Sequence, residues 1–382
     1  MTRLLSQERE TILVANRIDV KTFAEDDKAM YDRLIVNGSK IDGMIESLEQ
    51  LVSQEDPVGK DIFHFIHENG LKVTNKTAAF GTVMIIYESR PDVTVEAGGI
   101  AFKSGNKILL KGGKEAINSN LAIVDLWHKA LEENDISKNW VEYMNFNRQE
   151  TQEFLKNPTQ KTDLIVPRGG EKLIAFVKDN ATCPVIVSGR GNNFVYVHTE
   201  ADLDKAIGII VNAKTAKISA CNALDKVLID SNLEDFDTFM HKLLAKLKAH
   251  KVEILGDEIV AKFKGVKTIP SEDTWYEEFL DHKILIAMVS SKEVAIAKIN
   301  KYSGGHSASI ITENKKVANE FLESVDSAAV YHNASTRFTD GFQFGLGGEL
   351  AISTDKLHHR GPMGMQHLVT NKWYILGDGQ IR

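Results

Sequence analysis

The sequence predicts an α/β protein in which a doubly wound parallel sheet is joined to a second α/β unit. Short apolar runs rich in Val and Ile alternate with amphipathic segments along most of the chain. Paired glycines follow two of these runs, a pattern typical of strands that turn into the next helix of a parallel sheet. With 382 residues, the chain exceeds a single ordinary core, so two or three structural units are expected.

The amino-terminal part is predicted to begin with helices. Apolar residues recur at helical spacing between residues 6 and 52. The clearest set is Ile41, Met44, Ile45, Leu48 and Leu51. From Gly70 the pattern changes to alternating and β-branched residues, which predicts a hairpin that runs into a buried strand at 83–87. A second strand is predicted at 107–113, before a helix at 115–131.

The same order of strand, glycines and helix recurs at 163–180, and a further strand is predicted at 183–191. Beyond residue 221 the alternation continues and predicts the second α/β unit. Its predicted strands are 226–230, 283–289 and 307–312, and its predicted helices are 233–249 and 291–300.

Composition indicates an ordinary globular protein, with 43% hydrophobic and 26% charged residues. The net charge of -7, from 46 basic and 53 acidic residues, provides no general attraction to nucleic acid or to an anionic membrane. The amino terminus is charged, and no apolar run reaches the length of a membrane span. A cytoplasmic protein that acts on a small-molecule substrate is therefore expected.

Two glycine pairs at strand ends are the candidate phosphate-binding sites. They are Lys111 with Gly112 and Gly113, and Arg168 with Gly169 and Gly170. In parallel sheets, glycines at the carboxyl ends of strands let the backbone approach a phosphate, and the next helix points its N-terminus at it. Each pair alone also fits an ordinary turn, but two at successive strand ends favour a dinucleotide site. The absence of a G-x-G-x-x-G motif disfavours an ordinary Rossmann dehydrogenase.

The chain has two cysteines, and Cys221 is the candidate nucleophile. Its neighbours are small or polar, and Lys214 and Lys217 lie close upstream, where positive charge would favour the thiolate. The alternative is a free cysteine packed as a small hydrophobic residue. Cys183 precedes Pro184 and an apolar run and is interpreted as structural. Two isolated cysteines exclude a disulfide framework and a cysteine zinc site, and no metal is predicted.

The carboxyl-terminal segments 333–354 and 358–364 concentrate Gly, Ser, Thr and Arg, which is typical of functional loops. Arg337 and Arg360 make a carboxylate-binding or phosphate-binding role as plausible as a plain glycine-rich connector. We expect Ser335, Thr336 and Arg337, with the loop from Gly345 through Gly347 to Gly348, to form this anion anchor. Arg360 is the alternative anchor.

Taken in order, these segments resemble the signatures of the gamma-glutamyl phosphate reductases, a family of the aldehyde dehydrogenase superfamily. The resemblance extends from near the amino terminus to the end of the chain. The matching segments are YESRPDVTVEAGGIAFKSGNKILLKGG, LIVPRGG, NAKTAKISACNALDKVLI, INKYSGGHSASIIT, NASTRFTDGFQFGLGGELAIST, HHRGPMG and the ending KW..LGDGQIR.

The resemblance implies reduction of L-glutamyl 5-phosphate to L-glutamate 5-semialdehyde with NADPH, a step of proline biosynthesis. It implies that Cys221 forms a thioester and that Ser89, with the backbone N–H of Cys221, stabilises the oxyanion. Lys111 matches the lysine that holds the adenosine ribose and its 2′ substituent. Glu278 matches the glutamate that holds the nicotinamide ribose. The same resemblance requires no metal.

The implied fold is aldehyde dehydrogenase-like, with a Rossmann-type cofactor domain, a catalytic α/β domain and a small oligomerisation element. The cofactor domain is expected at 1–65 and 84–208, and the catalytic domain at 209–345. The oligomerisation element is expected at 66–83 and 346–382, so a homodimer or a higher homo-oligomer is predicted. Glutamate 5-kinase, which would supply the labile acyl phosphate, is a candidate partner.

Two other functions fit parts of the sequence. One is an NAD-dependent aldehyde dehydrogenase with another substrate. Hydrolytic members carry a general-base glutamate where this chain has Val187 and Ser188, which counts against that reading. The other is a catalytically inactive nucleotide-binding protein, against which the intact Cys221 segment argues.

Overall fold

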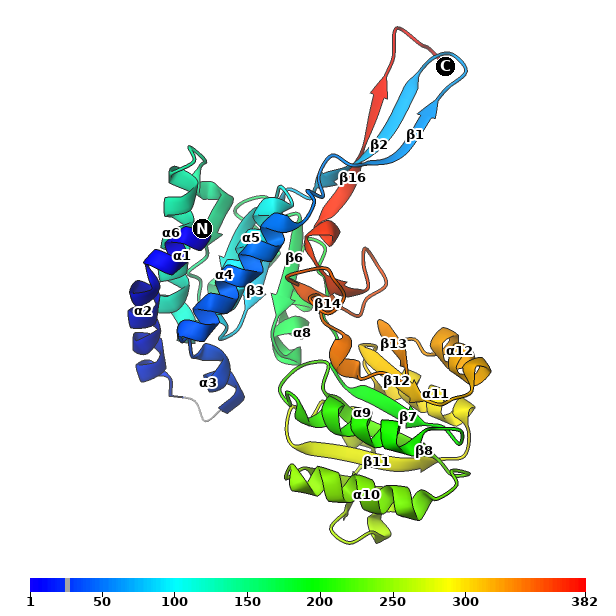
Figure 1. The fold of residues 1–382 in the computed structure, drawn as a ribbon. Helices are drawn as coiled ribbons and strands as arrows, with labels where there is room; N and C mark the ends of the chain where they lie inside the picture. Colours follow the sequence, from blue (N-terminus) through cyan, green and yellow to red (C-terminus); the bar gives the residue numbers. More distant parts are fainter. Residues whose placement is uncertain (25–27) are drawn as a thin grey trace. The chain divides into compact units, whose positions relative to one another are not determined.

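The computed structural model describes residues 1–24 and 28–382. The chain forms two compact units (Figure 1). The first unit comprises residues 1–188, 345–351 and 362–382, and the second comprises residues 189–344 and 352–361. Among the described residues, no helix is both long enough and apolar enough to cross a membrane.

The first unit is built on a parallel four-stranded sheet in the order β5-β4-β3-β6. Its strands are β3 (Thr82–Tyr87), β4 (Lys107–Lys111), β5 (Val141–Tyr143) and β6 (Leu164–Arg168). Its helices are α1 (Thr2–Gln7), α2 (Arg9–Thr22), α3 (Lys28–Leu34), α4 (Gly38–Ser53), α5 (Pro91–Lys103), α6 (Ile117–Glu132), α7 (Arg148–Lys156) and α8 (Glu171–Asn180), with short 3-10 turns at η1 (Lys114–Ala116), η2 (Lys138–Trp140) and η6 (Met365–His367).

Alternation along β3 explains why helices cover both faces of this sheet. Val83 and Ile85 join the core formed with α4, α5 and α6. Met84 and Ile86 join a smaller core formed with α7 and α8. Successive side chains of a strand point to opposite faces, so a continuous apolar run indicates a sheet that is buried on both sides.

A separate antiparallel sheet in the first unit brings together segments from opposite ends of the sequence. It has the order β1-β2-β16, with β1 (Asp61–Ile66), β2 (Lys72–Ala79) and β16 (Val369–Leu376). The red β16 lies beside the blue β2 in Figure 1, with Trp373 opposite Asn75. Every residue of β1 is exposed, including Phe63 and Phe65.

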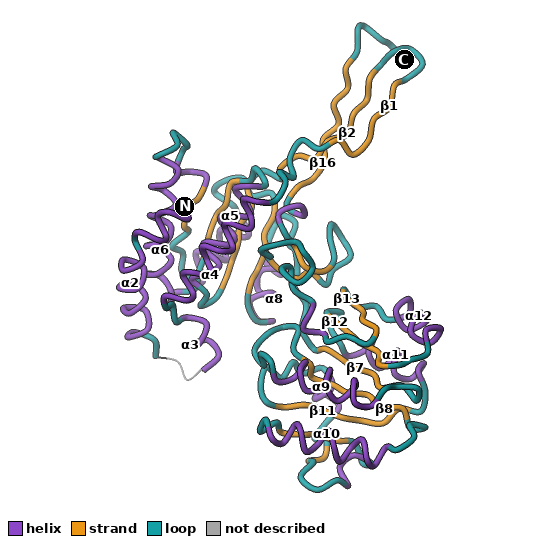
Figure 2. The backbone as a smooth tube through the Cα atoms, in the orientation of Figure 1, coloured by secondary structure: helices purple, strands orange, loops and turns teal. Residues whose placement is uncertain are grey.

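The second unit contains a parallel seven-stranded sheet in the order β10-β9-β11-β8-β7-β12-β13, and Figure 2 shows its strands in orange. The strands are β7 (Asn193–Val197), β8 (Leu224–Asp230), β9 (Glu253–Gly256), β10 (Lys267–Thr268), β11 (Lys283–Val289), β12 (Ser307–Ile311) and β13 (Ala329–His332). The helices are α9 (Leu203–Thr215), α10 (Phe236–Ala249), α11 (Lys292–Tyr302) and α12 (Lys315–Ser324), with 3-10 turns at η3 (Val260–Lys262), η4 (Glu272–Trp275) and η5 (Thr336–Phe338).

The predicted α/β class with two parallel sheets is confirmed, but the strand predicted at 183–191 is wrong. That segment makes only an isolated bridge, between Val185 and Ile165. The next strand is β7, which pairs with β8 and β12 and therefore belongs to the second sheet. For this reason the units divide at residues 188 and 189, earlier than the 208 and 209 expected from the sequence.

The carboxyl-terminal region also divides differently from the expectation. Part of the segment predicted for oligomerisation, residues 352–361, belongs to the second unit. The short strands β14 (Ala351–Ser353) and β15 (Gly361–Met363) pair with each other and span the points where the chain passes from one unit to the other.

Candidate active site

Cys221 lies in a tight turn between α9 and β8, and its side chain is half-buried. Two features hold the turn in place. The Asn193 side-chain N–H donates to the Cys221 carbonyl at 2.7 Å and to the Ala223 carbonyl at 2.7 Å. A Cβ on Gly191 would lie 1.9 Å from the Cys221 carbonyl oxygen, so only glycine lets the backbones approach this closely. The nucleophile candidate therefore sits on a rigid backbone.

Asn222 ties this turn to the loop around η5. Its side-chain N–H groups donate to the carbonyl of Arg337 at 3.2 Å and of Thr339 at 2.9 Å. In return, the Thr336 hydroxyl donates to the Asn222 carbonyl at 2.8 Å. The Cys221 turn and the Arg337 loop are thus fastened to each other within the second unit.

Arg337 is the cation that this arrangement brings to the cysteine. Its Nε and Nη1 are buried and have no hydrogen-bond partner among the described residues. Burial lowers the pKa of Arg337, and the negative charges of the Cys221 thiolate and of Asp340 oppose that shift. Buried donors without a protein partner are costly, so they point to a bound anion or acceptor.

The other predicted anchor residues are engaged within the protein. The Ser335 hydroxyl donates to Asn212 Oδ1 at 2.9 Å, and Thr336 is fully buried. Arg360 donates to the Asp326 carboxylate at 2.7 Å and to its backbone carbonyl at 2.9 Å. Among these candidates, Arg337 has two buried side-chain donors without a described partner, Nε and Nη1, whereas Arg360 has one, its Nε.

The glycines predicted beside this anchor belong to the first unit. Gly345 and Gly347 both have left-handed φ angles, of 73° and 72°. A Cβ on Gly347 would lie 1.8 Å from the Gln54 side chain, which donates to the Leu346 carbonyl. Their loop is therefore packed against the end of α4.

Of the two lysines upstream of Cys221, Lys214 has a different partner from the one expected. Lys214 is fully buried and paired with Asp225 at 3.0 Å, so its charge is balanced away from the thiol. Lys217 is exposed. Cys183 packs against the smaller core of the first unit, and burial raises the pKa of its thiol. The structure thus assigns Cys183 to packing.

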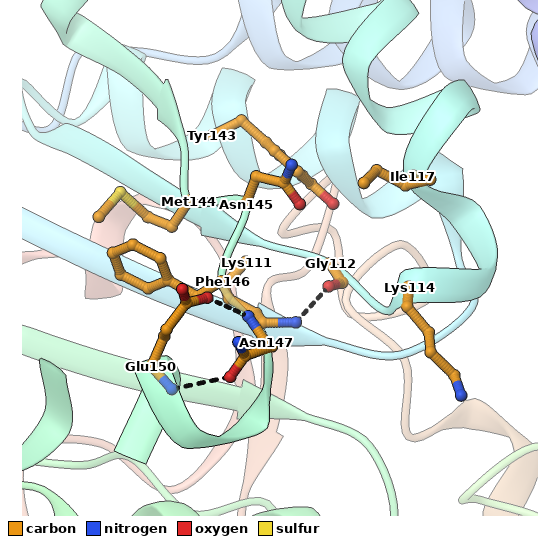
Figure 3. Close-up of a pocket in the computed structure, with 10 residues that line it drawn as sticks. All are labelled: Lys111, Gly112, Lys114, Ile117, Tyr143, Met144, Asn145, Phe146, Asn147 and Glu150. Carbon is orange, nitrogen blue, oxygen red and sulfur yellow. Dashed lines mark hydrogen bonds between the residues drawn. The ribbon is translucent and has the colours of Figure 1, made fainter. Parts of the chain in front are cut away.

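A pocket of about 330 Å³ opens in the first unit, beyond the end of β4 (Figure 3). Its lining residues are Lys111, Gly112, Lys114, Ile117, Tyr143, Met144, Asn145, Phe146, Asn147 and Glu150. The two lysines provide positive charge, and Tyr143 and Phe146 provide aromatic surface. Figure 3 shows Lys114 on the opposite side of the pocket from Phe146 and Glu150. This combination suits a ribose, a phosphate and a planar base.

Lys111 is half-buried and donates to the Gly112 carbonyl at 2.7 Å. Burial lowers its pKa, and Glu115 partly opposes this shift. Gly112 cannot carry a side chain, since a Cβ there would lie 2.2 Å from Asn120 Nδ2. Glu150 is occupied in a capping box at the start of α7, where it accepts from the Asn147 backbone. The lysines are thus the charged groups available to an anion in this pocket.

The two helix starts predicted to bind phosphate differ in availability. The buried Asp19 carboxylate accepts from the backbone N–H of Asn118 and of Ser119, so the first turn of α6 already has an anion. At α8, the N-cap is Gly170, and its backbone N–H donates to Glu88 Oε2 at 3.2 Å. The start of α8 therefore also has a carboxylate beside it, but a single long bond holds it, and a Cβ on Gly170 would meet no described atom within 4 Å.

Arg168 and Ser89 have internal partners. Arg168 donates to the Leu350 carbonyl and lies among the charges of Glu349, Glu96 and Asp92. Ser89 is buried, and its hydroxyl lies 3.3 Å from the Met30 carbonyl, a long hydrogen bond. Arg168 therefore connects β6 to the backbone at Leu350 within the first unit, whereas the Ser89 hydroxyl makes only a weak hydrogen bond to the Met30 carbonyl.

Glu278 lies in the irregular segment between η4 and β11 and is half-buried. The backbone groups of the residues on either side of it are hydrogen-bonded to side chains of β8. The Glu277 carbonyl accepts from Lys226 at 2.7 Å, and the Phe279 N–H donates to Asp225 at 3.1 Å. The position of Glu278 is consequently set by residues of β8.

Several residues of these sites were not predicted from the sequence. Asn222 adjoins Cys221, and its short polar side chain at a tight turn was a usable signal. The role of Asn193 could not be predicted from the sequence, because the Cys221 carbonyl to which it donates lies 28 residues further along the chain. Lys114 and Asn145 follow the ends of β4 and β5, where the sheet geometry predicts ligand contacts once the strand order is known.

Comparisons with known proteins agree on one family. The model of the aldehyde dehydrogenase family matches residues 36–260. The gamma-glutamyl phosphate reductase of Thermotoga maritima is 43% identical over 381 residues, which cover 99% of this chain and 91% of that protein. The reductase of the same name from Clostridium botulinum is 42% identical, with 100% of this chain and 92% of that protein covered.

Solved structures give the same result. The crystal structure of the T. maritima reductase matches with a TM-score of 0.93 and covers 100% of this chain and 92% of that one. Glyceraldehyde-3-phosphate dehydrogenase from Methanocaldococcus jannaschii, complexed with NADP, matches with a TM-score of 0.69 at 16% identity and covers 99% of this chain and 88% of that one. At that identity, the second match shows a shared fold.

Proposed function

This chain belongs to the aldehyde dehydrogenase family, among its gamma-glutamyl phosphate reductases, and from that premise we propose the residues that carry out its reaction. The reaction is reduction of L-glutamyl 5-phosphate to L-glutamate 5-semialdehyde in proline biosynthesis. One observation carries the assignment of the site: a half-buried cysteine fastened beside an arginine whose buried donors have no described partner.

In the proposed mechanism, the Cys221 thiolate attacks the acyl carbon, the carbon–oxygen bond to phosphate breaks, and phosphate leaves with the electron pair. The backbone N–H of Cys221 stabilises the oxyanion, and the resemblance to the family assigns the same role to the hydroxyl of Ser89. The reduced nicotinamide, when bound, supplies the hydride. The resulting thiohemiacetal on Cys221 expels the aldehyde and restores the thiol.

Arg337 is assigned to the α-carboxylate of the glutamyl group. A planar guanidinium with free donors suits a carboxylate, because it can donate two parallel hydrogen bonds. Anchoring the remote end of the substrate orients the acyl carbon at Cys221. Arg360, which is neutralised by Asp326, is assigned a structural role instead.

The cofactor is a nicotinamide dinucleotide, and we assign NADPH. Lys111 and Lys114 in the 330 Å³ pocket would hold the adenosine ribose and its 2′-phosphate. Gly169 and Gly170 at the uncapped start of α8 would hold the pyrophosphate. Glu278 would hold the nicotinamide ribose. A Cβ on Gly170 would meet no described atom within 4 Å, which supports this fit, and the phosphate would replace Glu88 as the acceptor of the Gly170 backbone N–H.

The sheet of β1, β2 and β16 is proposed to join two copies of the chain. Phe63, Phe65, Trp373 and Leu376 are all exposed, and such apolar surface is typical of an interface. We expect a homodimer or a larger homo-oligomer in the cytoplasm. Glutamate 5-kinase remains a candidate partner, since it would supply the labile acyl phosphate.

Phosphate-dependent oxidation of glutamate semialdehyde, followed by the absorbance of the reduced nicotinamide, tests this function. We expect continuous reduction of NADP with phosphate present and no more than one equivalent per enzyme without it, because phosphate must cleave the thioester before the next turnover. Turnover with NAD and no phosphate would instead indicate a hydrolytic aldehyde dehydrogenase. Lys111→Ala and Lys114→Ala are each expected to raise the KM for NADPH more than the KM for NADH. Equal effects on the KM for NADPH and for NADH would indicate that the lysines contact the ribose and not its 2′-phosphate.

A further inference from the structure

A group of buried charges lies on α9 and β8, the two elements that flank the Cys221 turn. Lys214 on α9 and Asp225 and Lys226 on β8 have exposed fractions of 0%, 2% and 0%. All seven residues of β8 are buried. Buried ions need partners to offset lost hydration, and packed apolar side chains of similar size often stabilise a core at least as well. Simple packing therefore does not account for three charged groups here.

The charges form a connected set that ends on one short segment of backbone. Lys214 Nζ donates to Asp225 Oδ1 at 3.0 Å. The other carboxylate oxygen, Asp225 Oδ2, accepts from the Phe279 backbone N–H at 3.1 Å. Lys226 Nζ donates to the Glu277 carbonyl at 2.7 Å and lies 3.7 Å from the centre of the Phe279 ring. Each β8 residue thus holds the main chain on one side of Glu278.

We propose that Asp225 and Lys226 are positioning residues that fix the main chain of Glu278, and so the carboxylate that meets the nicotinamide ribose. This inference rests on the proposed function, which gives Glu278 its ligand. Because β8 begins at Leu224, directly after the Cys221 turn, the same strand places both the nucleophile and the ribose contact. Hydride transfer depends on that relative placement.

Other charged groups surround this set and bear on its protonation. Burial lowers the pKa of Lys226 to about 7, Asp225 and Glu277 oppose the shift, and Lys214 and Lys283 add to it. A neutral amine still donates a hydrogen bond to a carbonyl. The bond to Glu277 therefore survives deprotonation, and the positioning role holds on both sides of neutral pH.

Lys283 provides a matched control. It lies over the same ring, 4.5 Å from its centre, but its described hydrogen bond goes to the Glu277 side chain at 3.5 Å. Its side chain is also 26% exposed. Lys226→Met and Lys283→Met therefore each remove a lysine amine from the same ring, and only the first removes a bond to the backbone beside Glu278.

The test compares wild type, Lys226→Met, Asp225→Asn and Lys283→Met as full-length protein. NADPH affinity is measured by fluorescence titration, hydride transfer by the isotope effect of NADPH deuterated at the transferring position, and the thiol by its alkylation rate with iodoacetamide. We expect Lys226→Met to weaken NADPH binding about 5- to 20-fold, in line with one lost charge-assisted hydrogen bond, and to raise the isotope effect on kcat. Its alkylation rate and the behaviour of Lys283→Met should stay within twofold of wild type.

Asp225→Asn keeps the size of the side chain and should act in the same direction, so it also serves if Lys226→Met does not fold. Normal NADPH binding and a normal isotope effect in the β8 variants would overturn the inference, as would an equal effect of Lys283→Met. Failure of the proposed function is a different result: the wild-type protein would then show no phosphate-dependent reduction of NADP, and the inference would fall with it.

Discussion

Replacing Arg337 is the perturbation that separates substrate recognition from chemistry. Its Nε and Nη1 are buried without a described partner, so a bound carboxylate would gain charge-assisted hydrogen bonds there. One such bond contributes about 1.5 to 3 kcal/mol. At about 1.4 kcal/mol for each factor of ten, Arg337→Met should lower the preference for glutamyl phosphate over acetyl phosphate roughly 10- to 100-fold. Arg337→Lys should fall between, because it keeps the charge and loses the planar fork.

The ratio of the two kcat/KM values is the informative measurement. Arg337 also lies in the field of Cys221, so its removal disfavours the thiolate and slows both substrates. That shared effect cancels in the ratio, and the pH dependence of iodoacetamide alkylation reports it separately. Arg360→Met is the control, because Asp326 already binds that guanidinium. An unchanged ratio in Arg337→Met, or an equal loss in Arg360→Met, would refute the assignment.

Three further predictions test other parts of the structure. Cys221→Ser should abolish turnover and leave NADPH affinity unchanged, whereas Cys183→Ser should remain active. If steady-state kinetics showed an active Cys221→Ser and an inactive Cys183→Ser, Cys183 would be the nucleophile instead. Phe65→Glu, on the exposed face of β1, should yield monomers in sedimentation velocity, and Leu357→Glu, at an equally apolar exposed position elsewhere, should not. Since burial lowers the pKa of Lys226 to about 7, the unfolded chain binds more protons between pH 7 and about 10, so the free energy of unfolding should rise with pH in that window. Denaturant titrations at pH 7.5 and 9.5 should show a smaller rise in the free energy of unfolding for Lys226→Met than for wild type. An unchanged rise would mean that another group causes the pH dependence.

Much of the fold could be predicted because its signals are local. The run KILIAMV gave β11 at its observed bounds, since a strand buried on both faces is a continuous apolar segment. The strand predicted at 183–191 failed for a reason that sequence alone does not contain. Its first part is apolar, but it forms a single bridge to β6, at Val185. The second unit begins a few residues later, at Gly189.

The candidate site divides in the same way. Cys221, Arg337 and Lys111 stand in short motifs, so their residue types and spacing made them candidates before any contact was known. The choice among candidates required the structure, because it depends on partners distant in sequence. Arg360 and Arg337 look equivalent in the chain, and only the contact of Arg360 with Asp326 separates them. The two glycine pairs look equivalent until the structure shows that Asp19 accepts from two backbone N–H groups at the start of α6, whereas Glu88 accepts from one at the start of α8.

The segment LDKVLID shows where sequence interpretation reaches its limit. Alternation rules place Asp225 and Lys226 on opposite faces of a strand, and charged residues are usually taken to lie at the surface. In the structure both are buried, and both reach the backbone around Glu278. A buried charge is stable only where its partners are already in place, and these partners come from α9 and from the segment before β11. The charges that look most ordinary in the sequence are therefore those whose role depends most on the complete fold.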